Sequence, residues 1–156
     1  ADWSFAASDG TPQLFRKMFP SPVADEFSMS RTKVSYLISD GLAPCFKRNL
    51  CKDISNASTG YTIHFDETGN AQGRKQCNIL VRYWSEQSNQ IEVRFLKTLY
   101  FGHAKGADVS KGILDTIQEE GYQIPLPGLL SISSDGPNVN KKVWTLINES
   151  IKEAGL

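Results

Sequence analysis

Apolar and polar side chains alternate most clearly near the middle of the chain. The alternation runs through Tyr61, Thr62, Ile63, His64, Phe65 and Asp66. A period of two is the pattern of a strand, and β-branched and aromatic residues favour that structure. The pattern breaks at Gly69-Asn70, so it predicts that Asp66 lies where the strand gives way to a turn.

Two further strands are predicted soon after the first. They span residues 77–85 and 90–100, and each is reached through a short polar connection. Short connections favour antiparallel neighbours, so the three strands should form a meander. Within 90–100 the apolar positions alternate with Glu92 and Arg94, which predicts that one face of this strand meets water over its first half.

Helical periodicity precedes the strands. Ser30 is a predicted N-cap for a helix with an apolar face of Val34, Leu37 and Ile38, which Gly41 should end or bend. Pro44 suits the first turn of a second helix. The residues of that helix spaced for burial are Cys45, Phe46, Leu50 and Ile54.

Helical and strand patterns alternate in the last third of the chain. A helix over about 108–120 should bury Val109, Ile113, Leu114 and Ile117 and stop at Gly121. A short apolar strand over 129–134 then leads to Asp135. A final helix is predicted to run to about residue 154, with Val139, Val143, Ile147 and Ile151 on its buried side.

This order of elements predicts an α/β fold with a mixed sheet. The helix after the third strand must cross over, so the fourth strand should lie parallel to the first. If it lands beside the first, the strand order is 3-2-1-4. Asp66 and Asp135 then sit at the C-terminal ends of adjacent parallel strands, where open α/β sheets usually carry their chemistry.

Composition and hydrophobic periodicity divide the chain into three predicted parts. Residues 1–29 form an arm rich in aromatic residues and proline, 30–58 a helical segment, and 59–156 the domain with the sheet. The arm carries Trp3, Phe5, Phe15, Phe19 and Phe27, which need a surface to bury against, either on the main domain or on a partner.

Composition narrows the class of protein. The 156 residues suit about one domain, and 17 basic residues balance 17 acidic ones. No global field therefore draws the chain to nucleic acid or to an anionic membrane. No apolar run approaches the length of a membrane span, so no membrane partner is predicted.

The cysteines and histidines indicate a reducing compartment. Cys45, Cys51 and Cys77 are odd in number and lack the spacing of a zinc knuckle. We therefore expect reduced thiols and an intracellular protein, nuclear or cytoplasmic. His64 is interpreted as a packed core histidine that shares the face of Asp66, and His103 as a helix cap or a phosphate contact.

Two nearby carboxylates repel each other unless a proton or a cation lies between them. Mg²⁺ and Mn²⁺ prefer oxygen ligands and are commonly held by a pair of carboxylates together with water and phosphate oxygens. Asp66 and Asp135 are therefore candidate metal ligands for phosphodiester chemistry. In the alternative interpretation Asp66 binds its own turn and Asp135 only starts a helix.

Four segments carry a family resemblance: KVSYLISDGLAPCF, IHFDETGN, ILVRYW and SSDGPNVNKKV. From about Phe27 to the C terminus the chain resembles hAT-type transposases and their domesticated descendants, which share the ribonuclease H-like fold of DDE/D enzymes. The resemblance implies that Asp66 and Asp135 are the first two catalytic acids. It also implies metal-dependent strand cleavage and transfer on DNA, with Mg²⁺ or Mn²⁺ as cofactor.

The resemblance also implies a third acid, which the family places on a helix well after a fifth strand. The chain ends at Leu156 before any fifth strand, so we expect both the sheet and the triad to be incomplete. It begins at Ala1 without an initiator Met, so we expect a processed product or an excised fragment. Whether it is an enzyme by itself stays open. The glutamates that would have to substitute lie on polar helix faces; they are Glu119, Glu120, Glu149 and Glu153.

Three functions are weighed on this basis. The first is part of a transposase catalytic core that meets DNA through its parent protein. The second is a domesticated, non-catalytic module that binds protein or DNA. The third is a phosphate-handling enzyme of another α/β family. Against it, the chain lacks the second aspartate, two residues after Asp66, that a haloacid-dehalogenase-type phosphatase would use, and it has no Walker-type loop. The outer edge of strand 129–134 predicts self-association or cover by the N-terminal arm.

Overall fold

A computed structural model describes residues 4–19, 25–69, 73–102, 105–119, 122–135 and 138–153. The chain divides into two units, Ala1–Phe46 and Lys47–Leu156. The boundary between them falls inside helix α4 (Ala43–Asn56), within the helical segment that the sequence predicts.

The first unit is helical. A 3-10 helix (Phe5–Gly10) leads into α1 (Thr11–Met18), and α3 (Arg31–Tyr36) follows. The predicted N-cap is confirmed, because the Ser30 hydroxyl accepts a hydrogen bond from the Lys33 N–H at 3.2 Å. The helix does not stop at Gly41, since the backbone passes through a π-helical stretch (Leu37–Leu42) into α4.

The aromatic residues of the first unit pack on one another. The Phe15 ring lies 4.8 Å from that of Phe19 and 4.6 Å from that of Phe27, centroid to centroid. The Asp9 carboxylate accepts hydrogen bonds at 2.8 Å from the N–H and the Nε–H of Arg31, and these bonds lower the pKa of Asp9. Trp3 lies outside the described residues.

Burial of α4 follows the sequence pattern only in its second half. Ile54 is buried and Leu50 is partly buried, as predicted. The prediction was wrong for Cys45, which is exposed, and for Phe46, which is 69% exposed. Among the described residues of the first unit only Ser8 is buried, so these positions have no apolar layer to pack against.

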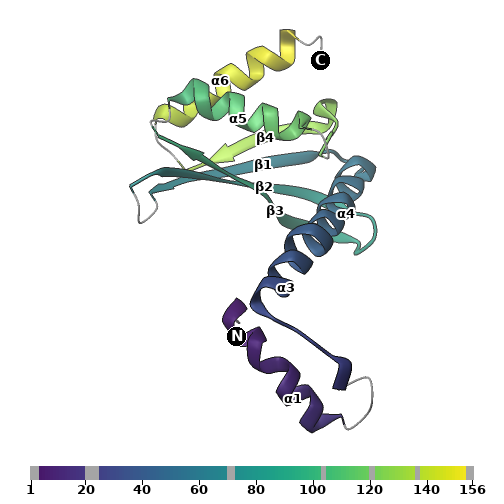
Figure 1. The fold of residues 1–156 in the computed structure, drawn as a ribbon. Helices are drawn as coiled ribbons and strands as arrows, with labels where there is room; N and C mark the ends of the chain where they lie inside the picture. Colours follow the sequence, from purple (N-terminus) through teal and green to yellow (C-terminus); the bar gives the residue numbers. More distant parts are fainter. Residues whose placement is uncertain are drawn as a thin grey trace. The chain divides into compact units, whose positions relative to one another are not determined.

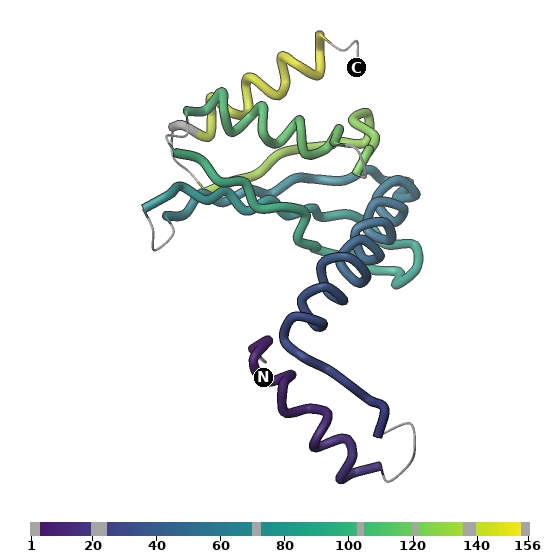
Figure 2. Tube along the Cα trace, viewed as in Figure 1, coloured from purple at the N-terminus to yellow at the C-terminus, as the bar shows by residue number. Residues whose placement is uncertain are grey.

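The second unit is an α/β fold around a four-stranded mixed sheet (Figure 1). The strands are β1 (Tyr61–Gly69), β2 (Lys75–Ser85), β3 (Gln90–Phe101) and β4 (Leu129–Ser134). Their order is β3-β2-β1-β4, with antiparallel pairing from β1 to β3 and parallel pairing of β1 with β4. The predicted meander, crossover and strand order are confirmed, and the trace in Figure 2 follows the same path.

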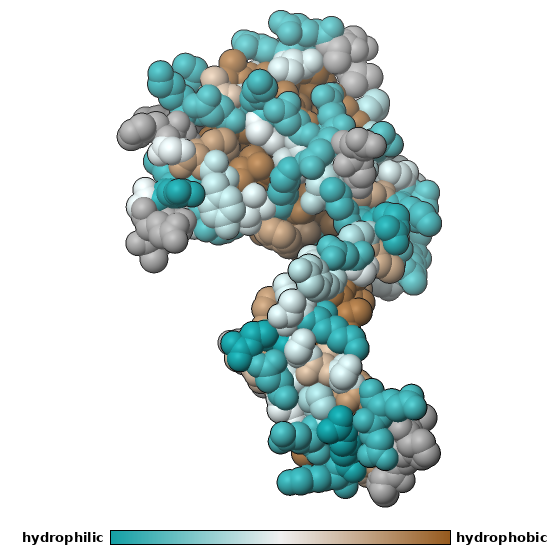
Figure 3. All heavy atoms as spheres, in the orientation of Figure 1, coloured by the Kyte–Doolittle hydropathy of each residue, from teal (hydrophilic) through white to brown (hydrophobic). Residues whose placement is uncertain are grey.

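Two helices cover one face of the sheet. They are α5 (Gly106–Gln118), which makes the crossover, and α6 (Asn138–Glu153), and they pack on each other (Figure 1). In Figure 3 hydrophilic side chains cover much of the outer surface of this layer. Among the described residues, no helix has both the length and the apolar character that a membrane crossing requires.

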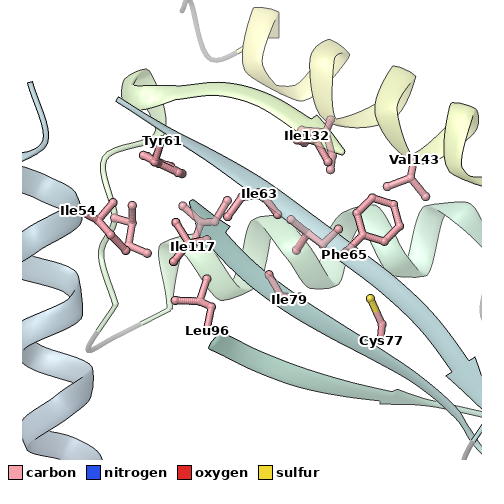
Figure 4. Packing of buried hydrophobic residues seen from close by; sticks show 14 of the residues in the cluster. Ile54, Tyr61, Ile63, Phe65, Cys77, Ile79, Leu96, Ile117, Ile132 and Val143 are labelled. Atoms are coloured by element: carbon pink, nitrogen blue, oxygen red, sulfur yellow. The ribbon is translucent and has the colours of Figure 1, made fainter. Parts of the chain in front are cut away.

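The core lies between these helices and the sheet. Figure 4 shows Phe65 of β1 and Val143 of α6 pointing toward each other there, with Cys77 of β2 close by. Most of the predicted stripes are confirmed: Val109, Ile113, Ile117, Val143 and Ile147 are buried, and Leu114 and Ile151 are half-buried. Gly121 and the side chain of Val139 lie outside the described part of the chain.

The opposite face of the sheet, here called the second face, carries exposed apolar side chains. On β3 these are Ile91, Val93 and Phe95, which are 54%, 52% and 57% exposed. Glu92 and Arg94 alternate with them and therefore lie on the helix-covered side, where they form an ion pair at 2.8 Å. The first half of β3 meets water with its apolar face, and Arg94 on the other side is 56% exposed as well, whereas Glu92 is 11% exposed.

Candidate metal centre

The two candidate aspartates lie at the same end of neighbouring strands. The parallel ladder pairs Ile63 with Ile132 and ends with Phe65 paired to Ser134. Asp66 and Asp135 are the next residues on each strand. Because hydrogen-bonded strands lie about 4.8 Å apart, Asp66 and Asp135 lie at a common rim of the sheet, as predicted.

Asp66 does not end its strand, in contrast to the prediction. The antiparallel ladder with β2 continues from Asp66 paired to Asn78 as far as Gly69 paired to Lys75. The reason is tertiary, since pairing with β2 overrides the weak strand preference of the acidic residues and glycine. Only the parallel pairing with β4 stops before Asp66.

Strand alternation turns the Asp66 side chain away from the core. Phe65 is 3% exposed on the helix-covered side, so its neighbour Asp66, which is exposed, lies on the second face. His64 shares that face as predicted. It is half-buried and outside the core cluster, with its Nε2 3.3 Å from the Thr62 hydroxyl, so its interpretation as a core histidine was wrong.

Asp135 is held by a residue of α6. The Asn140 side-chain amide donates to the Asp135 backbone carbonyl at 2.7 Å and to its Oδ1 at 3.2 Å. Asn140 itself is buried, at 8% exposed. One turn later the Trp144 indole N–H donates to the Ile132 carbonyl at 2.7 Å, which fixes the last part of β4 against the same helix.

Sequence reasoning missed Asn140, although the pattern carried a signal. Residue 140 precedes Val143, Ile147 and Ile151 at helical spacing and so belongs to the buried stripe of α6. A polar side chain in such a stripe must find a hydrogen-bond partner inside the fold. The end of the preceding strand was the nearest segment that offered one.

Glu67 adds a third carboxylate near this end of the sheet, on the helix-covered side. Its Oε2 lies 3.8 Å from the Lys75 ammonium, and its Oε1 is buried with no hydrogen-bond partner among the described residues. Cys77 is paired with Glu67 across the β1–β2 ladder. Burial, with smaller contributions from the negative charges of Glu67 and Asp66, raises the pKa of the Cys77 thiol to about 12.

The substitute third acids lie at the wrong end of their helices. The crossover helix α5 begins near the end of β3 and α6 just after Asp135, so both lead away from the rim. At 1.5 Å per residue, Glu149 and Glu153 lie roughly 16 to 22 Å along α6 from its start. Glu119 is bound to Lys97, which lowers its pKa. Glu120 lies outside the described residues.

The aromatic residues of β2 and their neighbour Arg82 lie on both faces of the sheet. Tyr83 is buried in the core, Trp84 is half-buried and Arg82 is exposed on the second face. This agrees with packing as the main role of the aromatic residues of β2. His103 lies outside the described residues.

The donor set at the rim suits a hard divalent cation. Two carboxylates at adjacent strand ends offer the oxygen ligands that Mg²⁺ and Mn²⁺ prefer, with water and phosphate completing the coordination. Across the ranges that the structure describes, no group of three or more His, Cys, Asp or Glu side chains is close enough to hold a metal ion. Asp66 and Asp135 therefore stay a predicted pair of metal ligands.

Neither a family model nor a curated protein matches the sequence significantly.

Proposed function

We propose that this chain is part of a transposase-derived, ribonuclease H-like catalytic core of the hAT type. In the parent protein its activity is metal-dependent cleavage and strand transfer of phosphodiesters in DNA. The observation that carries the proposal is the register of the β1–β4 ladder, which brings Asp66 and Asp135 to one rim. The antiparallel meander followed by a parallel fourth strand supports the finer assignment of the fold.

Each residue at the rim has a distinct role in this proposal. Asp66 and Asp135 supply carboxylate oxygens to Mg²⁺ or Mn²⁺. An ion held by these two residues would supply the Lewis-acid chemistry that phosphodiester cleavage requires. Phe65 anchors β1 in the core directly before the first acid, and the β1–β4 ladder keeps the two acids in register.

Calorimetric titration of Mn²⁺ tests the proposal on the isolated chain. We expect wild type to bind the ion, and Asp66→Asn and Asp135→Asn each to lose most of that affinity. Asp115→Asn is the matched control, because Asp115 is an exposed carboxylate on α5 away from the rim. The proposal would be contradicted if wild type and Asp66→Asn both showed no heat of binding at about 1 mM Mn²⁺, a concentration that detects even weak binding.

A second candidate function is a domesticated, non-catalytic module that binds protein or DNA. Three neighbouring alternate positions of β3, Ile91, Val93 and Phe95, leave apolar side chains more than half exposed on the second face. Contiguous apolar surface often marks a contact site. Binding of a partner that survives Asp66→Asn together with Asp135→Asn, but not Val93→Lys, would favour this function over the first.

A further inference from the structure

We infer that Asn140 is a positioning residue for the candidate metal centre, one that fixes the Asp135 carboxylate on the rim. The inference rests on the proposed function for its chemical purpose, because it concerns how one of the two carboxylates is held. Its geometric basis is independent of any cation. It is the pair of hydrogen bonds from the Asn140 amide to Asp135, at 2.7 Å to the carbonyl and 3.2 Å to Oδ1.

The two bonds act on different degrees of freedom. The bond to the carbonyl oxygen fixes the backbone where β4 ends, and the bond to Oδ1 restrains the rotation of the side chain. The two N–H groups of one amide suffice for both. The bond to Asn140 engages only Oδ1 of the carboxylate, so the same bond can persist while Oδ2 binds a cation.

Attachment of α6 to β4 does not by itself require Asn140. The Trp144 indole already donates to the Ile132 carbonyl at 2.7 Å, and the apolar stripe of α6 packs in the core. An apolar residue at position 140 would continue that stripe without the cost of burying an amide. The hydrogen bonds to the backbone and the carboxylate of Asp135 therefore explain why an amide side chain occupies this buried position.

Restraint of a metal ligand by a hydrogen-bond donor is a recognised means of raising metal affinity. Loss of such an outer contact typically weakens binding about 10-fold to 100-fold. Asn140 donates and does not itself offer a charged ligand, so its contribution is to the orientation of Asp135. Replacing it should change the side-chain conformation of Asp135 and the affinity for the cation together.

The experiment compares Asn140→Ala with Trp144→Phe, and Asn140→Leu serves as a second variant that fills the vacated space. Trp144→Phe is the matched control, because it also removes one hydrogen bond between α6 and β4, but the acceptor of that bond is the Ile132 carbonyl and not Asp135. Urea denaturation of each variant establishes that it folds. Two readouts follow, namely the χ1 rotamer of Asp135 from NMR couplings without metal and the Mn²⁺ affinity from calorimetry.

We expect Asp135 to hold one χ1 rotamer in wild type and in Trp144→Phe and to average between rotamers in both Asn140 variants. The Mn²⁺ dissociation constant should rise about tenfold in the Asn140 variants and change little in Trp144→Phe. An unchanged Asp135 rotamer in the Asn140 variants would overturn the inference. So would equal Mn²⁺ affinity of wild type and both Asn140 variants.

The two readouts separate this inference from the proposed function. If wild type binds no Mn²⁺, the proposed function fails, and the rotamer still decides whether Asn140 restrains Asp135. If wild type binds Mn²⁺ through Asp66 and Asp135 while Trp144→Phe weakens binding as much as Asn140→Ala does, the proposed function stands and the inference is overturned.

Discussion

Phe65 and Ser134 are the last paired residues of the parallel ladder between β1 and β4, and each directly precedes a candidate metal-binding aspartate. Phe65 and Asp66, two consecutive residues of β1, therefore have different roles. Phe65 fills the core on the helix-covered side, and Asp66 faces the other way. Stability and chemistry are carried by adjacent residues and should be separable by mutation.

Phe65→Ala should lower the stability of the fold, whereas Asp66→Ala should weaken metal binding and leave the stability nearly unchanged. Removing the buried ring is expected to lower the free energy of unfolding by about 3 to 5 kcal/mol. Asp66 is exposed, so Asp66→Ala should change that free energy by less than about 0.5 kcal/mol while removing a metal ligand. Urea denaturation measures both, and a large loss of stability in Asp66→Ala would contradict the assignment of faces.

Two valines on neighbouring strands test which face of the sheet is covered. Val81 of β2 is fully buried, whereas Val93 of β3 is 52% exposed on the second face. Val81→Thr buries a hydroxyl in an apolar layer and should cost about 1 to 3 kcal/mol. Val93→Thr should be nearly neutral. Chemical denaturation of the two variants side by side checks this, and equal losses would mean that the second face is covered in solution.

The strand order and the common rim of the aspartates were predictable from sequence, because alternation, connection length and crossover geometry leave few topologies. The limits of β4 agree with the prediction for the same reason, since six residues between a Pro-Gly turn and Asp135 allow little choice. Periodicity assigns residues to two faces but does not tell which face a helix will cover. Exposure of Val93 and its neighbours was therefore visible only in three dimensions.

The other differences from the predictions arise from tertiary contacts that a local sequence pattern does not encode. β1 runs past Asp66 because its partner β2 extends to Lys75, a long-range effect that propensity does not encode. Phe46 has the spacing of a buried residue, yet it is 69% exposed, because the described residues of the first unit form no buried apolar layer around it. Asn140 required knowledge of which strand end α6 would meet.

Gly60→Ala should destabilise the junction between β1 and β4. The backbone of Gly60 has a φ of 76°, and a Cβ there would lie 2.6 Å from the Gly128 carbonyl oxygen. Strain and overlap together should cost at least about 1 to 3 kcal/mol. Gly73→Ala is the matched control, since its φ is 73° but the space around it is open. Thermal unfolding of both should give the larger loss for Gly60→Ala, and equal losses would assign the cost to backbone strain alone.

The Cys77 thiol predicts a loss of stability at alkaline pH. Burial raises its pKa from the usual 9.0 to about 12, so above pH 9 the unfolded chain releases this proton and the folded chain keeps it. The free energy of unfolding should then fall between about pH 9 and 12, by up to about 1.4 kcal/mol per pH unit. Below pH 9 the thiol is protonated in both the folded and the unfolded chain, so the stabilising contribution of the buried thiol is fully present there.

Cys77→Ala isolates this contribution, because burial raises the pKa of Tyr61 as well and its effect on stability has the same sign. We expect the difference in unfolding free energy between wild type and Cys77→Ala to be constant below pH 9 and to shrink above it, as measured by urea denaturation. A difference that does not vary with pH would mean that the thiol titrates normally in the folded chain.

The ion pair between Glu92 and Arg94 disfavours the pairing of a further strand with the β3 edge of the sheet. A foreign strand joining beside β3 would have to accommodate these two charges on the side that the helices cover. The short strand at the other border, β4, ends its ladder in serines and offers no such obstacle. Any additional strand, from whatever chain, is therefore expected to extend the sheet at β4 and to form a second neighbour for the strand that leads to Asp135.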